Sequence, residues 1–130
     1  MLPLAHPRLW LAGAGLIATA IVIGSLLPSS MIPAVGISDK LEHAGAYFLL
    51  TFWITGLLER RRYVLSLLAG LLLGVGLEVS QSLLTATRQA DPLDVVANAT
   101  GIALALALAY LGLGGWARRV EAWFGAEKPG

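Results

Sequence analysis

The chain contains no cysteine and few charged residues. Charged side chains make up 13% of its 130 residues and apolar side chains 57%, whereas ordinary globular domains are roughly 25% charged and 45–50% apolar. The absence of cysteine excludes disulfides, thiol catalysis and thiolate metal ligands. The net charge of +1 is too small to indicate nucleic-acid binding. What remains is a set of long uncharged runs, which predicts an all-α, polytopic integral membrane protein.

Four runs are long enough to be membrane helices, each of which needs about 20 mostly apolar residues. Within a single domain covering the whole chain (1–130), we place the spans at 9–27, 41–58, 64–84 and 94–113. These four spans would form two helical hairpins. A signal peptide is the alternative for the first run, but the run is long and no clean small-residue cleavage site follows it.

A fifth, shorter segment follows the spans. In residues 116–124, Trp116, Val120, Trp123 and Phe124 fall on one side of a helix, with charged residues between them. This pattern is typical of an amphipathic helix that lies in the membrane interface, anchored by Trp. A frayed tail is the alternative.

The distribution of Lys and Arg predicts the orientation of the spans, because short cytoplasmic loops carry an excess of these residues. Seven lie near the two ends of the chain or in the second loop, and two lie in the first and third loops. The seven are Arg8, Arg60, Arg61, Arg62, Arg118, Arg119 and Lys128, and the two are Lys40 and Arg88. We therefore expect a multi-pass protein of the cytoplasmic membrane with both termini in the cytoplasm.

With this orientation, polar residues gather at the outer ends of the second, third and fourth spans. They recur at helical spacings of three or four residues, so each set lies on one side of its helix. Polar sides turn away from lipid, toward partner helices or a wet cavity. We predict an outward-opening pocket among these three helices, built from Asp39, Lys40, His43, Tyr47, Glu78, Gln81, Arg88, Asp94 and Asn98. Glu78 is expected to face His43, Arg88 and Asn98.

The predicted pocket is acidic. With Glu42 and Asp91 included, it holds five carboxylates (Asp39, Glu42, Glu78, Asp91 and Asp94) and two cationic side chains (Lys40 and Arg88), which sum to −3. Such a pocket favours cations or ammonium groups as ligands. We expect no metal and no cofactor, because the pocket contains a single imidazole beside its carboxylates.

Structural roles compete with these functional ones. Asp39 and Glu42 fit a capping box, and Asp91 followed by Pro92 fits a helix N-terminus. Gln81 and Asn98 are side chains that commonly hydrogen-bond between membrane helices. Glu78 is the hardest to explain structurally. It lies six residues before the end of the third predicted span, and an unpaired charge inside a membrane helix is costly.

Three segments also resemble the signature blocks of the VanZ-like membrane proteins: SDKLEHAGAYFLL, GLEVSQ and RQADPLDVVANATG. The matching positions lie between residues 38 and 101 and are Asp39, Lys40, His43, Tyr47, Glu78, Gln81, Arg88, Asp94, Asn98 and Gly101. The resemblance implies a cell-envelope protein. The founding member of that family is associated with resistance to teicoplanin, a glycopeptide antibiotic that targets cell-wall precursors.

Three functions follow as hypotheses. The first is a non-catalytic envelope or teicoplanin-resistance factor that binds a glycopeptide, a cell-wall precursor or a lipid-linked ligand. The second is an intramembrane enzyme in which His43 acts with Glu78 or Asp94 as acid and base while Arg88 holds a phosphate; no hydrolase or metalloprotease motif supports it. The third is a structural protein. The expected partners are the bilayer and one of these ligands, with self-association left open.

Overall fold

The computed structural model describes residues 1–27, 31, 38–84 and 91–126. These residues form helices and no strand, which confirms the all-α class. The elements are α1 (Pro7–Leu26), α2 (Asp39–Leu57), a short 3-10 helix η2 (Arg60–Arg62), α3 (Tyr63–Leu84), α4 (Pro92–Leu108), a π-helical turn η3 (Ala109–Leu113) and α5 (Trp116–Ala126). Each helical segment predicted from the sequence coincides with one of these helices to within a few residues.

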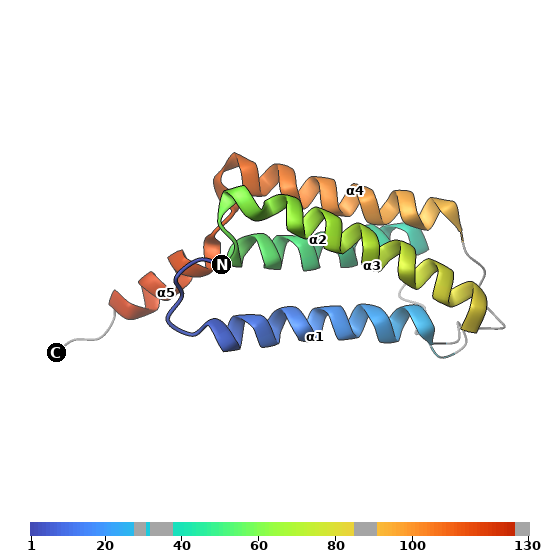
Figure 1. The fold of residues 1–130 in the computed structure, drawn as a ribbon, viewed down its shortest axis with the longest axis horizontal. Helices are drawn as coiled ribbons and strands as arrows, with labels where there is room; N and C mark the ends of the chain where they lie inside the picture. The colour runs from blue at the N-terminus through green and yellow to red at the C-terminus, as the bar shows by residue number, and fades with distance from the viewer. Residues whose placement is uncertain (28–30, 32–37, 85–90, 127–130) are drawn as a thin grey trace.

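Helices α1 to α4 lie side by side, and successive helices run in opposite directions (Figure 1). As a result, α1 and α3 end where α2 and α4 begin, and we call this the polar end of the bundle. The amino terminus, η2 and α5 lie at the opposite end, which we call the basic end because it carries Arg60–Arg62. The bundle therefore separates the two groups of charged residues along its length.

Three of the described helical segments are long and apolar enough to cross a membrane: Pro7–Leu26, Arg60–Leu84 and Pro92–Leu113. Helix α2 is not among them, because its first turn carries Asp39, Lys40 and Glu42. Although α2 is more polar than the three membrane-competent segments, it packs against α1, α3, α4 and α5. Its place in the bundle thus depends on contacts with other helices more than on its own apolarity.

The closest helix pair is α2 with α4, and glycine makes this approach possible. A Cβ atom at Gly101 would collide with the backbone carbonyl of Ala44. A Cβ atom at Gly70 would lie 2.9 Å from Cδ1 of Ile102, which is fully buried between α3 and α4. Gly70 and Gly101 therefore serve helix packing, as small residues commonly do between membrane helices.

The chain leaves α4 through a glycine turn. Gly112 and Gly115 have φ values of +109° and +66°, a backbone region that favours glycine. The turn directs Trp116 toward the bundle, where its ring lies 5.3 Å from the rings of both Trp10 and Trp53.

The predicted anchoring side of α5 is divided in two. Trp116 packs against α1 and α2 and donates a hydrogen bond from Nε1 to the carbonyl of Phe52 at 3.1 Å. By contrast, Trp123 and Phe124 are 65% and 60% exposed. Only the second pair is available to a membrane interface, and the interfacial position of α5 stays a prediction.

Candidate functional site

The start of α2 supplies three side chains of the site: Asp39, Lys40 and His43. The first turn begins at Ser38, whose side chain accepts a hydrogen bond from the backbone N–H of Leu41 at 3.3 Å. The prediction that Asp39 caps this helix is therefore wrong, because Ser38 holds the capping position one residue earlier. Asp39 is instead the first helical residue, and its carboxylate contacts Lys40 and His43.

Helix α4 begins as the sequence predicts. Asp91 is its N-cap and accepts a hydrogen bond from the backbone N–H of Leu93 at 2.8 Å, with Pro92 in the first turn. One turn later, Asp94 points toward α2 and is 6% exposed. The cap fixes the start of α4, and this in turn fixes the carboxylate of Asp94 beside the first turn of α2.

Lys40 joins the two helix starts. Its ammonium contacts Oδ2 of Asp91 at 2.5 Å, Oδ1 of Asp94, and Oδ2 of Asp39 at 3.4 Å. The hydrogen bond from Lys40, together with that from the Leu93 backbone, holds the pKa of the Asp91 carboxyl below its usual range. Lys40 therefore belongs to the site, where its ammonium holds three carboxylates close together.

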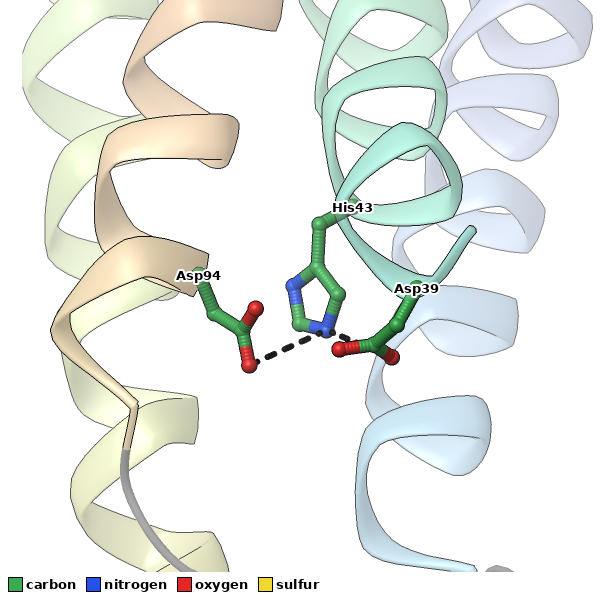
Figure 2. A group of neighbouring side chains, drawn as sticks. All are labelled: Asp39, His43 and Asp94. Carbon is green, nitrogen blue, oxygen red and sulfur yellow. Dashed lines mark ion pairs between the residues drawn. The ribbon is translucent and has the colours of Figure 1, made fainter. Parts of the chain in front are cut away.

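The ring of His43 lies between two carboxylates (Figure 2). Its Nε2 is 3.7 Å from Oδ1 of Asp39 and 3.7 Å from Oδ2 of Asp94. Its Nδ1 lies 3.1 Å from Oδ1 of Asn98. The side chains of His43 and Asp94 are 13% and 9% exposed, whereas that of Asp39 is 51% exposed. One side of this cluster is thus buried between α2 and α4, and the other side is open.

Ligand atoms of Asp39, His43 and Asp94 all lie within 4.8 Å of one another. Nitrogen and carboxylate oxygen are both common ligands of divalent metals. The sequence analysis placed all three residues in the predicted pocket, but their single imidazole led us to expect no metal.

Glu78 and Gln81 connect α3 to its neighbours. Glu78, which is 5% exposed, accepts a hydrogen bond from the backbone N–H of Asp91 at 2.6 Å. Gln81 donates from Nε2 to the carbonyl of Ser25 in α1 at 2.9 Å, which confirms an interhelical hydrogen bond. Glu78 was expected to face His43 and Asn98; among the described residues its hydrogen bond is to Asp91, while His43 and Asn98 pair with each other.

Arg88, the remaining predicted partner of Glu78, lies outside the described residues. Tyr47 is 2% exposed and packs where α2, α3 and α4 meet. A Cβ atom at Gly74 would lie 3.5 Å from Cε1 of Tyr47 and 3.2 Å from Nδ2 of Asn98. Gly74 thus makes room for both side chains below the acidic cluster.

A pocket of about 350 Å³ lies next to the cluster, between α1 and α2. Asp39, Glu42, His43 and Tyr47 line its polar part, and Ile17 and Ile21 of α1 belong to its apolar wall. The sequence-based prediction placed the pocket among the second, third and fourth helices. That space is instead filled by Tyr47, Asn98 and Ile102, all of which are buried.

The contribution of α1 was missed because its run is almost wholly apolar. The one feature that could have indicated it is the pair Gly24 and Ser25 near the end of α1, since small residues permit a close approach of another helix. The residues that the structure does bring together are Asp39, Lys40, His43, Asp91, Asp94 and Asn98, with Glu78 attached through the backbone of Asp91.

Fold and site together define a small all-helical protein with membrane-competent helices and a polar, mostly acidic cluster at one end of its bundle. Comparison of the chain with protein-family models, with curated proteins and with solved structures finds no match. The function is therefore argued from the site itself.

Proposed function

We propose that the chain is a four-span, VanZ-like protein of the cytoplasmic membrane that binds an amine-bearing envelope ligand in the pocket beside its acidic cluster. Candidate ligands are a glycopeptide such as teicoplanin and a lipid-linked cell-wall precursor. The proposed role is non-catalytic: the pocket captures the ligand at the outer face of the membrane.

The fourth span in this proposal is α2. It runs antiparallel to α1 and α3 and packs against both (Figure 1). With α2 inserted, the polar residues of its first turn would lie at the outer membrane surface, where charges are tolerated at low cost. The excess of Lys and Arg at the basic end favours a cytoplasmic position for that end.

The observation that carries the proposal is the two-sided lining of the pocket. Carboxylates of Asp39 and Glu42 lie in its polar part, and Ile17 and Ile21 lie in its apolar wall. An amphiphile that carries an ammonium group and an apolar portion would satisfy both parts. Among the described residues Lys40 pairs with Asp39, Asp91 and Asp94 and not with Glu42, so Glu42 is the main lining carboxylate for an ammonium group.

The test is protection of a susceptible bacterial host against teicoplanin, with vancomycin as comparison. Cells would carry wild type, Glu42→Gln, Ile21→Trp or no insert, at matched membrane levels. Glu42→Gln removes a carboxylate from the polar part, and Ile21→Trp fills the apolar part. We expect wild type to raise the inhibitory concentration of teicoplanin and both variants to lose most of that increase.

Two matched controls separate the pocket from general damage. Glu59→Gln removes a carboxylate at the basic end, and Leu16→Trp enlarges a side chain that is 72% exposed on the same helix as Ile21. Both should protect as well as wild type. Protection that survives Glu42→Gln and Ile21→Trp would remove the pocket from the function, and absence of protection by wild type would overturn the resistance role.

A further inference from the structure

We infer that Asp39, His43 and Asp94 form a binding site for a divalent transition-metal ion at the polar end of the bundle. This inference depends on the contacts of the cluster and is independent of what fills the adjacent pocket. It also departs from the expectation drawn from the sequence, where a single imidazole gave no reason to expect a metal.

The first argument is the arrangement of the three ligand atoms. Two atoms bound to one tetrahedral Zn²⁺ at about 2.0–2.2 Å lie about 3.4 Å apart. Nε2 of His43 is 3.7 Å from Oδ1 of Asp39 and 3.7 Å from Oδ2 of Asp94, so both pairs are already close to this spacing. All three ligand atoms lie within 4.8 Å of one another, and a small rotation of the half-exposed Asp39 side chain completes the set.

The second argument concerns the tautomer of His43. A neutral imidazole carries one ring proton, and the hydrogen bond at one nitrogen decides where that proton resides. Oδ1 of Asn98 lies 3.1 Å from Nδ1 and, as an amide oxygen, can only accept a hydrogen bond from an N–H there. The lone pair of Nε2 then faces the two carboxylates. A metal ion between these three atoms would accept electron pairs from all of them, whereas Lys40 contacts only the other oxygen of each carboxylate.

The third argument is the position of Lys40. Its ammonium contacts Oδ2 of Asp39 and Oδ1 of Asp94, which are the oxygens that do not face His43. Lys40 therefore orients both carboxylates without occupying the space between them and the ring. Asn98 orients the ring in the same way. Metal sites commonly have such supporting hydrogen bonds behind their ligands.

The ligand chemistry indicates the kind of ion. One imidazole nitrogen with two carboxylates suits Zn²⁺ and similar transition metals, whereas Mg²⁺ and Ca²⁺ prefer oxygen ligands alone. Three protein ligands leave at least one coordination position for water or another small ligand. Because Asp39 and His43 also line the pocket, the ion would lie at the pocket wall, with Glu42 remaining as the carboxylate for an amine.

The test is the binding of Zn²⁺ to the purified full chain in detergent, by equilibrium dialysis with metal analysis, with Mg²⁺ as comparison. We expect one Zn²⁺ per chain and weaker binding of Mg²⁺. Asp39→Asn and His43→Gln should each weaken Zn²⁺ binding by at least about 10-fold, and Asn98→Ala by about 10- to 100-fold, the range seen when supporting residues behind metal ligands are lost.

The chain offers matched controls for these variants. His6→Gln removes its other histidine, and Glu59→Gln removes a carboxylate, both at the basic end. Both should bind Zn²⁺ as wild type does. Circular dichroism confirms that each variant is folded, and Asp39→Asn keeps the test valid if a buried variant fails to fold, because Asp39 is half exposed.

Absence of stoichiometric Zn²⁺ in wild type would overturn the inference. Binding that Asp39→Asn and His43→Gln leave unchanged would overturn it as well. Neither result bears on teicoplanin protection, so the metal site and the ligand pocket can fail separately.

Discussion

Asp91 both caps α4 and forms an ion pair with Lys40. Its Oδ1 accepts from the backbone of Leu93, its Oδ2 contacts Lys40, and its own backbone N–H donates to Glu78. One residue thus links α2, α3 and the start of α4. Because Lys40 and the Leu93 N–H stabilise the charged form, the pKa of Asp91 is lower in the folded chain than in the unfolded chain.

This shift predicts a pH dependence of stability. A carboxyl whose pKa is lowered by folding stabilises the fold above its unfolded pKa of about 3.9, and this contribution is lost as the pH falls through the folded value. We expect the melting temperature of wild type to fall more steeply below about pH 4 than that of Asp91→Asn, in detergent with a chelator. Asparagine keeps the cap but loses the charge. Parallel pH curves for the two proteins would show that Asp91 contributes nothing to this dependence.

At the scale of helices, α5 ties the two ends of the chain together. Glu121 accepts hydrogen bonds from the backbone N–H groups of Ala5 and His6, at 2.7 and 2.9 Å, and from Nε1 of Trp10 at 2.8 Å. Arg119 donates to the carbonyls of Gly112 and Leu113, both at 3.1 Å. Glu121 thus lies at the start of α1 and Arg119 at the end of η3, which continues α4, and helix dipoles favour both placements.

The contact between α2 and α4 yields a prediction about stability. Gly101→Ala would drive a methyl group into the backbone of Ala44, which cannot move aside as a flexible side chain can. We expect the free energy of unfolding to fall by about 3 kcal/mol or more, the upper part of the range for overpacked cores. Unfolding in mixed detergent micelles, followed by circular dichroism, measures this change.

Gly45→Ala is the matched control, because the structure places nothing within 4 Å of a Cβ atom at Gly45. The same substitution in this open helical position should be neutral or should stabilise by up to about 1 kcal/mol, through helix propensity alone. Equal losses at Gly45 and Gly101 would contradict the close approach of α2 and α4.

The helices were predictable because they depend on local features: run length, breaks in the runs, and caps such as Asp91-Pro92. The prediction was off by one residue at Asp39, because Ser38 is also a good cap and local rules do not decide between the two. The partner of Glu78 was not predictable. It depends on how the end of α3 meets the start of α4, which is a contact between separate elements.

The cluster itself was largely predictable, since five of the nine residues assigned to the pocket are joined by the contacts of Lys40 and His43. The five are Asp39, Lys40, His43, Asp94 and Asn98, and Glu78 is attached to them through the backbone of Asp91. The pocket position was not predictable, because an apolar wall such as α1 carries no pattern that distinguishes a ligand from lipid. The hydrogen bond between Nδ1 of His43 and Asn98 was not predictable either, because folding brings these two residues together from separate helices.

For the whole molecule, the central claim is that α2 crosses the membrane and holds the polar end outside. Without this span, the chain would have three crossings, and the residues before and after α2 would lie on the same side. With it, the acidic cluster faces the envelope and the basic end faces the cytoplasm. The proposed envelope function depends on this difference, whereas the metal site does not.

Cysteine accessibility in intact cells tests most directly whether α2 crosses the membrane, and the chain holds no cysteine of its own to interfere. Met31, between α1 and α2, is 67% exposed, and the side chain of Arg61, between α2 and α3, is 74% exposed. We predict that Met31→Cys reacts with a membrane-impermeant maleimide in intact cells, and that Arg61→Cys reacts only after permeabilisation. Equal labelling of the two positions would contradict a fourth span, and the reverse pattern would place the cluster in the cytoplasm.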